Sequence, residues 1–399
     1  MKNKPTIREQ FFAHVGQTSP SPLGIEIQKA EGVFLLSPGG KQYVDLISGV
    51  SVSNVGHARP EVIRAIKEQA DAYTHLMVYG EIIQRPQVQL ASLLAENLPG
   101  GMSSVYFVNS GSEANEAALK LAKRVTGRGH IACFSNAYHG STHGALSIMG
   151  NEDFRQAFRP LLPGITALEF NSFKDLNKID GTFACVIAEP LQAEAGVITP
   201  APGFLPALRK RCTDTGTLLI FDEVQTGFGR LGTLFAMEKY GVVPDIVTLA
   251  KALGGGMPLG ALACNPELMN AWQNNPVLGH ITTFGGHPVC CAAGLASLKV
   301  LLQEPWIEQA GEKASYVRQV IGAHPRVKEI RGEGLLLAVE LGSADSLQQM
   351  ISLLLEEGVL SDWFLYCDTA FRISPPLCIS MQELEYTCRK VLNALDRLK

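Results

Sequence analysis

Two short apolar runs in the middle of the chain each lead to an ionisable residue that could do chemistry. Residues 217–221 are followed by Asp222, and residues 245–249 are followed, after one alanine, by Lys251. Because apolar runs without alternation are typical of strands covered on both faces, we expect a parallel sheet with both residues at one edge. A carboxylate and an amine there could hold one cofactor. A structural ion pair between them is the alternative that these runs leave open.

Lys251 stands before a stretch of small residues, 252–258, that includes three consecutive glycines. A lysine at the end of a buried strand is unusual, because desolvation of its ammonium group is costly. An amine whose pKa is depressed in this way could form a Schiff base with a carbonyl compound.

A predicted strand at 104–108 runs through Ser110 and Gly111 into a helix that begins at Ser112. The first N–H groups of a helix are unpaired and its dipole is positive there, so this turn could bind a phosphate group. The alternative is an ordinary capping box, since Ser110 and Glu113 have the S-x-x-E spacing.

Three other segments carry candidate ligand contacts, each with a structural alternative. Tyr138 follows a predicted strand and could stack on a planar heterocycle or merely pack in its loop. The neighbouring His139 is expected to be a hydrogen-bonded structural residue. Thr283 could donate to a phosphate or belong to a helix-entry turn. Arg372 precedes two prolines and could bind a carboxylate in bidentate fashion or lie on the surface.

The elements that must position these residues alternate between strand and helix. This order predicts an α/β fold with a large, doubly wound, mostly parallel sheet that could include one antiparallel strand. Strands are predicted at 104–108, 130–134, 183–188, 217–221, 245–249 and 260–264, and helices at 60–72, 85–97, 112–126, 203–215 and 288–304.

The two ends of the chain follow other patterns. Residues 1–25 indicate a loosely held arm, and residues 26–46 an antiparallel meander. After Pro305 an α+β tail follows. We therefore predict that residues 1–55 and 304–399 form one small domain beside a large domain of residues 56–303.

The composition excludes several classes of protein. The chain has 399 residues, a net charge of -4, and 46% hydrophobic against 18% charged residues. This balance favours a globular protein and gives no support to nucleic-acid or membrane binding. Nine cysteines without a C-x-x-C pair predict neither a disulfide framework nor a metal site. No apolar segment of signal-peptide length follows the start, so we expect a cytoplasmic protein.

Taken together, the motifs resemble the class III (omega-amino) aminotransferases, which are fold-type I enzymes that use pyridoxal 5′-phosphate. The resemblance also includes residues 45–50 and 56–57, which lie towards the N-terminus. No G-x-G-x-x-G follows a strand, which argues against a nucleotide-binding dehydrogenase. The matching segments, in chain order, are 109–115, 138–140, 188–194, 222–230, 251, 282–286 and 371–376.

The resemblance implies two catalytic residues. Lys251 would form the Schiff base with the cofactor and then move a proton, and Asp222 would pair with the ring nitrogen and keep it protonated. The implied cofactor contacts are Gln225 at the phenolic oxygen, Val224 and Tyr138 on the ring faces, Ser110, Gly111 and Ser112 at the phosphate, His139 and Glu189 beside them, and Thr283 from the second subunit of a homodimer with a shared active site.

The resemblance also implies a substrate site. Arg372 would bind the substrate carboxylate, and Glu194 would pair with Arg372 when the bound amine lacks one, with Val50 nearby. Ser141 departs from the family pattern, because an arginine that binds a second carboxylate often follows the aromatic-His-Gly motif. Possible substitutes for that arginine are Arg59, Arg85 or a residue of the neighbouring subunit.

The function implied is ping-pong transfer of an amino group from an omega-amine or amino acid to a 2-oxo acid. An acetylornithine- or ornithine-like donor is the first expectation. The alternatives are an aminomutase of the glutamate-semialdehyde type, an amino-acid racemase and, more distantly, a non-catalytic binding protein with the same fold.

Overall fold

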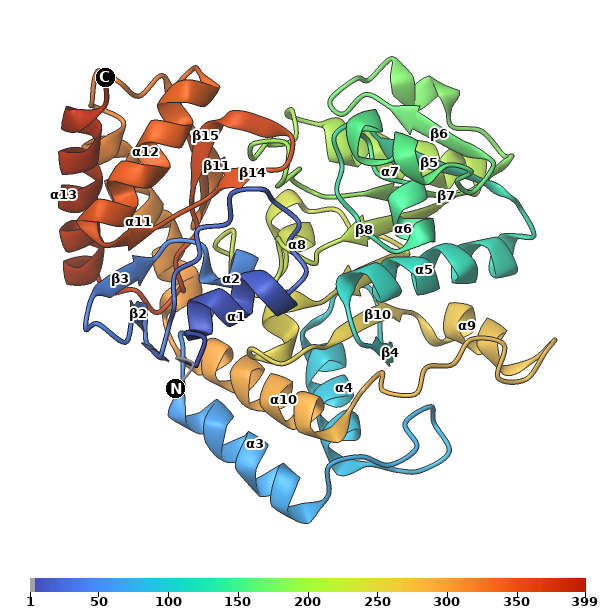
Figure 1. The fold of residues 1–399 in the computed structure, drawn as a ribbon. Helices are drawn as coiled ribbons and strands as arrows, with labels where there is room; N and C mark the ends of the chain where they lie inside the picture. Colours follow the sequence, from blue (N-terminus) through green and yellow to red (C-terminus); the bar gives the residue numbers. More distant parts are fainter. Residues whose placement is uncertain (1–3) are drawn as a thin grey trace.

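A seven-stranded sheet forms the centre of the larger part of the molecule in the computed structural model, which describes residues 4–399 (Figure 1). All neighbouring strands are parallel except β10, which is antiparallel to both of its neighbours. The predicted α/β fold is confirmed. The strand order is β4 (Ser104–Val108), β10 (Gly260–Cys264), β9 (Ile246–Leu249), β8 (Leu218–Asp222), β7 (Phe183–Ala188), β5 (His130–Phe134) and β6 (Ile165–Leu168).

Strand β7 shows why the apolar runs do not alternate with polar residues. All of its residues are buried. Cys185 and Ile187 pack in one core cluster with residues of helix α5 (Gly111–Thr126). Val186 and Ala188 pack in another cluster with residues of α7 (Phe204–Thr215). The sheet is therefore covered on both faces, and its polar residues collect at the strand ends.

Three helices of the large part pack together below the sheet in the view of Figure 1. Helix α10 contacts both α3 and α4. Each begins with a proline in its first turn, where the missing N–H donor costs no helical hydrogen bond. The helices are α3 (Pro60–Ala72), α4 (Arg85–Asn97) and α10 (Pro288–Gln303).

A second, antiparallel sheet lies in the C-terminal part, in the order β11 (Glu329–Glu333), β12 (Leu336–Glu340), β15 (Cys367–Ile373) and β14 (Trp363–Phe364). The N-terminal meander of β1 (Lys29–Glu31), β2 (Phe34–Leu36) and β3 (Gln42–Asp45) forms a third sheet, of four strands, with β13 (Val359–Leu360) of the C-terminal part. Val359 pairs in parallel with Val44, so the two chain ends meet. This pairing supports the predicted domain limits, which stay a prediction. The helices here are α11 (Trp306–Ile321), α12 (Ala344–Glu357) and α13 (Met381–Arg397).

Some short elements were not predicted. The arm of residues 1–25, predicted to be loosely held, contains helix α1 (Ile7–His14), which has no buried residue. The described residues include no helix long and apolar enough to cross a membrane. The other short helices are α2 (Ser48–Ser51), α6 (His143–Ser147), α8 (Ala236–Tyr240) and α9 (Pro266–Met269), with single 3₁₀ turns η1 (Glu152–Phe154), η2 (Gln156–Phe158), η3 (Asp175–Lys178), η4 (Lys251–Gly254) and η5 (Asn270–Gln273).

Candidate active site

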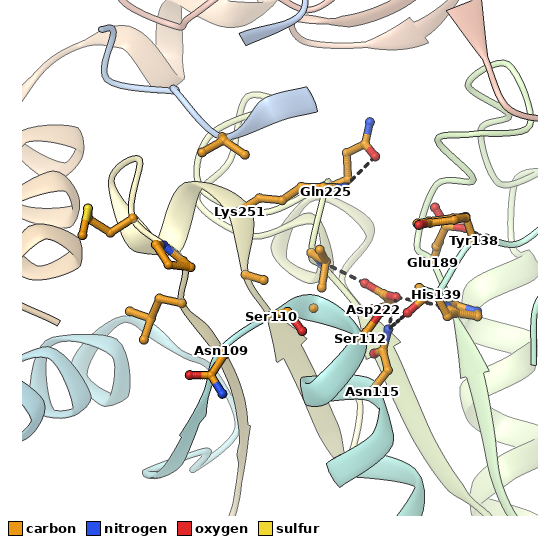
Figure 2. Close-up of a pocket in the computed structure, with 18 of the residues that line it drawn as sticks. Asn109, Ser110, Ser112, Asn115, Tyr138, His139, Glu189, Asp222, Gln225 and Lys251 are labelled. Atoms are coloured by element: carbon orange, nitrogen blue, oxygen red, sulfur yellow. Dashed lines mark hydrogen bonds and ion pairs between the residues drawn. The ribbon is translucent and has the colours of Figure 1, made fainter. Parts of the chain in front are cut away.

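Asp222 and Lys251 lie at the carboxyl edge of the large sheet and line the same cleft, which has a volume of about 490 Å³ (Figure 2). Asp222 is the last residue of β8, and Lys251 begins the turn η4 just after β9. The Lys251 amine donates to Gln225 Oε1 at 2.9 Å. In the described structure it forms no ion pair with Asp222, which lies instead against His139. The alternative of an ion pair closing the sheet is therefore wrong.

The backbone and the surroundings of Lys251 both set it apart. Its φ of +51° is in the left-handed region, which residues other than glycine rarely adopt outside functional sites. Burial lowers the pKa of the Lys251 amine, although the nearby carboxylates of Glu194 and Asp222 oppose this shift. A lowered pKa increases the fraction of the neutral amine, which is the form that can act as a nucleophile or base.

Three donors fix the carboxylate of Asp222 (Figure 2). Asn115 Nδ2 donates to Oδ2 at 2.8 Å, His139 Nδ1 lies 2.7 Å from the same oxygen, and Val224 N donates to Oδ1 at 3.0 Å. Asn115 is itself fixed, because its Oδ1 accepts a hydrogen bond from the hydroxyl of Thr248 at 2.7 Å. The arrangement presents a rigid carboxylate to the cleft, with the lining residue His139 as one of its hydrogen-bond partners.

The start of α5 forms one side of the cleft. Ser110 caps the helix, accepting from Glu113 N at 3.2 Å. The Glu113 carboxylate binds Asn109 N at 2.7 Å. The N–H groups of Gly111 and Ser112 have no helical acceptor and remain for an anion. Gly111 leaves no room for a side chain, since a Cβ would lie 2.8 Å from Val224 Cγ1.

The adjoining side of the cleft is formed by Tyr138, with the buried acid Glu189 bound to its backbone. Tyr138 N donates to Glu189 Oε1 at 2.9 Å, and Ala193 N donates to Glu189 Oε2 at 3.0 Å. Burial raises the pKa of Glu189 to about 7. The Tyr138 hydroxyl lies 3.3 Å from Ser141 Oγ, and Ser141 N donates to Ser112 Oγ at 3.1 Å. Ser141 therefore links the aromatic wall to the start of the helix.

These residues fit pyridoxal 5′-phosphate. A buried amide nitrogen, Gln225 Nε2, has no hydrogen-bond partner in the described structure and could donate to a bound ligand. The cleft also offers free helix N–H groups for a phosphate, a fixed carboxylate at Asp222 for a ring nitrogen, and an amine at Lys251 for an aldehyde. Tyr138 and Val224 supply apolar surface for a planar ring.

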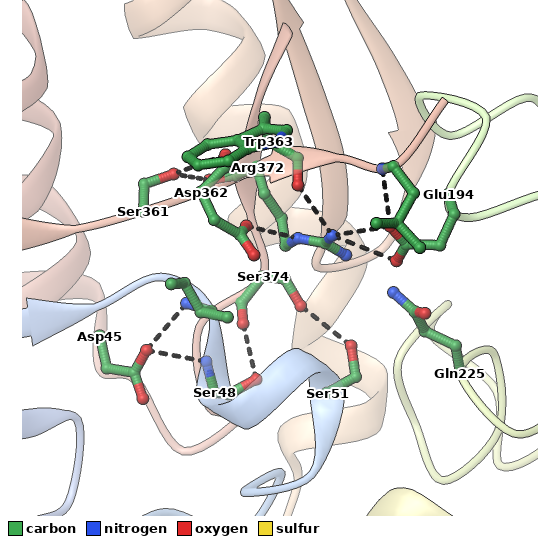
Figure 3. A network of polar contacts seen from close by, with 12 residues as sticks. Asp45, Ser48, Ser51, Glu194, Gln225, Ser361, Asp362, Trp363, Arg372 and Ser374 are labelled. Carbon is green, nitrogen blue, oxygen red and sulfur yellow. Dashed lines mark hydrogen bonds and ion pairs between the residues drawn. The ribbon is translucent and has the colours of Figure 1, made fainter. Parts of the chain in front are cut away.

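Arg372 and Glu194 lie beside this cleft, where Gln225 points towards them (Figure 3). Arg372 Nη2 donates to both carboxylate oxygens of Glu194, at 3.1 and 3.3 Å. Only 1% of Arg372 is exposed. Its Nη1 has no partner within the described residues. The guanidinium could therefore take a substrate carboxylate in exchange for Glu194.

Some predicted site residues do not line the cleft of their own chain. Val50 is partly buried outside it, and Val52 is a lining residue instead. Thr283 is exposed and lies outside the lining. Arg59 pairs with Glu61 and Glu304, and Arg85 lines a different groove, between α3, α4 and α10. Within one chain, therefore, neither Arg59 nor Arg85 takes the place of the arginine that is absent at position 141.

The fold and the cleft thus bring a lysine, an aspartate and the start of a helix together at one edge of a mostly parallel sheet. The family model for aminotransferase class-III matches residues 15–395, and the chain belongs to this family. It is a pyridoxal-phosphate-dependent transaminase. The chain is 38% identical to the acetylornithine aminotransferases of Methanosarcina mazei, over 90% of this chain and 89% of that protein, and Methanopyrus kandleri, over 93% and 94%.

Solved structures show the same relationship. The ornithine aminotransferase of Toxoplasma gondii is 30% identical, with a TM-score of 0.91 and coverage of 99% of this chain and 96% of that one. An (S)-enantioselective omega-transaminase from Thermomicrobium roseum is 30% identical, with a TM-score of 0.90 and coverage of 98% and 97%.

Two polar contacts of the site were missed in the sequence. Asn115 lies one helical turn after Gly111, so it faces the same cleft, and this spacing was a usable signal. Asp362, which binds Arg372 Nε at 2.7 Å, carries no such signal, because it belongs to no recognised motif.

Proposed function

We propose that this enzyme transfers the terminal amino group of an acetylornithine- or ornithine-like donor to a 2-oxo acid by a ping-pong mechanism. The observation that carries this proposal is the buried pair of Arg372 and Glu194 beside Gln225 and Lys251. A carboxylate of the 2-oxo acid can replace Glu194 on the guanidinium. A terminal amine that lacks an adjacent carboxylate leaves the pair intact. The relatives named acetylornithine and ornithine aminotransferase support the choice of donor.

The residues of the cleft divide the work of the reaction. Pyridoxal phosphate, when bound, supplies an electron-accepting ring that stabilises negative charge on the substrate carbon. Asp222 would hold the ring nitrogen, and Gly111 and Ser112 would hold the phosphate. Lys251 would hold the aldehyde and later use its amine to take a proton from the substrate carbon. Tyr138 and Val224 would orient the ring and exclude water from its faces.

Ser141 is exposed, lies outside the lining of the cleft, and supplies no cation for a second substrate carboxylate. Among the described lining residues, Lys251 is the one with an amine or guanidinium group, and Met257, Pro258 and Leu259 add apolar surface. We therefore propose that pyruvate-like acceptors are used at least as well as acceptors with a second carboxylate. Ser141→Arg should shift this preference towards 2-oxoglutarate by about tenfold in kcat/KM. An unchanged ratio would remove Ser141 from the specificity site.

We also propose a homodimer with a shared active site. Thr283 is exposed between Ile281 and Phe284, which are 48% and 54% exposed, and Ile83 of the loop before α4 is 92% exposed. His75 of that loop packs on Phe284, with ring centroids 4.8 Å apart. Exposed apolar side chains gathered around a predicted phosphate ligand suit burial against a second copy. Light scattering of the purified protein tests the stoichiometry.

A cytoplasmic location is part of the proposal. All nine cysteines of the chain are free thiols, and most are buried. Unpaired cysteines in this number suit a reducing compartment.

The reaction can be tested by its two half-reactions. An amine donor added alone should change the absorbance of the bound cofactor, and a 2-oxo acid added afterwards should restore it. A racemase would leave the amino-group count unchanged, and an aminomutase would turn over one substrate without an acceptor. Lys251→Ala should retain cofactor by absorbance and lose turnover. Full activity of that variant, or no donor response by the parent enzyme, contradicts the proposal.

A further inference from the structure

A second carboxylate, Asp362, binds the buried guanidinium of Arg372 on the side opposite Glu194 (Figure 3). Arg372 Nε donates to Asp362 Oδ1 at 2.7 Å, while Nη2 donates to Glu194 at 3.1 Å. The two acids come from different parts of the fold. Asp362 lies in the same hairpin as Arg372, and Glu194 lies in the loop after β7. Glu194 Oε2 also accepts from Leu365 N of the hairpin at 3.2 Å. Neither contact of Glu194 involves Arg372 Nε, so its carboxylate can leave Arg372 without breaking the bond to Asp362.

The hairpin holds Arg372 through its backbone as well as its side chain. Arg372 N donates to Asp362 O at 2.9 Å, and Ser361 Oγ donates to Arg372 O at 2.7 Å. The Phe364 ring covers one face of the guanidinium, with 4.4 Å between the ring centroid and Cζ. Trp363 O accepts a further bond from Nη2 at 3.3 Å. Segment 361–364 therefore fixes both ends of the arginine.

The two acids beside Arg372 also favour its charged form. Burial alone would lower the pKa of Arg372, but Glu194 and Asp362 outweigh it, so that the pKa is raised. Nη1 has no partner among the described residues. When a substrate carboxylate displaces Glu194, Asp362 still orients the guanidinium, and Nη1 and Nη2 are both available to the incoming carboxylate.

We propose that Asp362 is the positioning residue for substrate carboxylates, holding Arg372 in place while Glu194 and the substrate exchange on its outer nitrogens. The inference rests on the proposed function, in which a substrate carboxylate replaces Glu194 on Arg372 and an amine without a carboxylate leaves that pair intact. It adds that Arg372 stays fixed in both states. Discrimination between the two kinds of substrate then depends on movement of Glu194 alone.

Calorimetric binding of propanoate to the holoenzyme tests this without turnover. Asp362→Ala removes the acceptor for Nε and should weaken propanoate binding about tenfold. Asp362→Asn keeps an oxygen at this position and should recover most of that loss. Asp362→Ser has too short a side chain to reach Nε, and replaces the alanine variant if that protein does not fold. Asp368→Ala is the matched control, because Asp368 is exposed on β15 of the same hairpin.

Steady-state kinetics give the second readout. Asp362→Ala should raise KM for a 2-oxo acid about tenfold and leave kcat/KM for an amine without a carboxylate within about twofold. Equal losses for both substrates, unchanged propanoate binding, or an asparagine variant as weak as the alanine variant would each overturn the role of Asp362. Failure of the parent enzyme to transfer an amino group would contradict the proposed function instead, and the propanoate result would still stand.

Discussion

Arg230 and Arg372 are the two largest fully buried side chains of the described chain, and their partners differ in kind. Arg230 donates to neutral oxygens: Leu335 O at 3.0 Å, Pro375 O at 2.7 Å, Ser48 Oγ at 3.3 Å, and Asn54 Oδ1. Arg372 donates to the carboxylates of Glu194 and Asp362.

The difference appears in the charge balance and in what each arginine can do. Burial lowers the pKa of Arg230 to about 9, whereas two carboxylates raise the pKa of Arg372. The backbone carbonyls around Arg230 cannot leave, so Arg230 joins the loop after β8 permanently to the N- and C-terminal segments. In the proposed mechanism a substrate carboxylate replaces Glu194 on Arg372, whereas Asp362 keeps its bond to Nε. We therefore expect a buried arginine to serve a ligand site when one of its partners is an acid that a ligand can replace, and a structural role when its partners are backbone oxygens.

The largest effect is expected at Arg230. Arg230→Leu leaves Leu335 O and Pro375 O buried without a donor, so the free energy of unfolding should fall by about 3–5 kcal/mol. Chemical unfolding followed by circular dichroism measures this. The folded fraction should keep the parent ratio of activities on carboxylate and carboxylate-free substrates. A change in this ratio would show that Arg230 also acts at the substrate site.

The substitution Arg372→Lys should affect selectivity more than stability. Lysine cannot bind a carboxylate in bidentate fashion, so kcat/KM for a 2-oxo acid should fall about 100-fold. For an amine without a carboxylate, kcat/KM should stay within about threefold. Half-reaction rates measure both values. If the two substrates lose activity equally, Arg372 is a structural residue like Arg230, and the comparison fails.

Much of the large sheet could be predicted because its strands are buried on both faces. That burial produces unbroken apolar runs, which end at Asp222 and just before Lys251. Strand β6 has two partly exposed residues and one exposed residue among its four, so its sequence carries a weaker pattern. Helix α1 has no buried residue, and its one local signal is the Thr6 capping box with Glu9.

The remaining part of the site depends on backbone geometry and distant contacts. Val50 was predicted as a substrate contact, but the chain from Ser48 to Ser51 has positive φ angles at every residue, including +61° at Val50. This left-handed turn changes which side chain faces the cleft, and Val52 lines it instead. The structural contacts of Asp362 and of Arg230 could not be read from the sequence. They join residues that come together only when the C-terminal sheet has folded.

Glu194→Gln tests whether the acid on Arg372 is exchangeable. A neutral amide competes less well with a substrate carboxylate, so KM for a 2-oxo acid should fall by about threefold to tenfold. KM for an amine without a carboxylate should rise, because Arg372 would then lose one balancing charge. Initial rates over a range of each substrate show the split. Parallel changes for both substrates would mean that Glu194 does not exchange.

An effect on stability alone is expected at Glu189, an acid with neutral partners on the same loop as Glu194. Burial raises the pKa of Glu189 to about 7 from 4.5. The folded protein therefore binds this proton more strongly than the unfolded chain does. Its contribution to stability is complete below pH 4.5 and is lost as pH rises through the folded pKa of about 7.

Between pH 5 and 8, Glu189→Gln should therefore flatten the decline in unfolding free energy by about 2 kcal/mol. Buried Glu223, whose pKa is also raised to about 7, leaves a residual slope of the same sign. Glu385→Gln is the control, because Glu385 is exposed. Urea unfolding at each pH gives the profile. If Glu189→Gln leaves the slope unchanged, Glu189 is ionised in the folded protein, and backbone N–H donors alone can hold a buried charge at this site. The difference between neutral and charged partners, which separates Arg230 from Arg372, would then not apply to a buried acid such as Glu189.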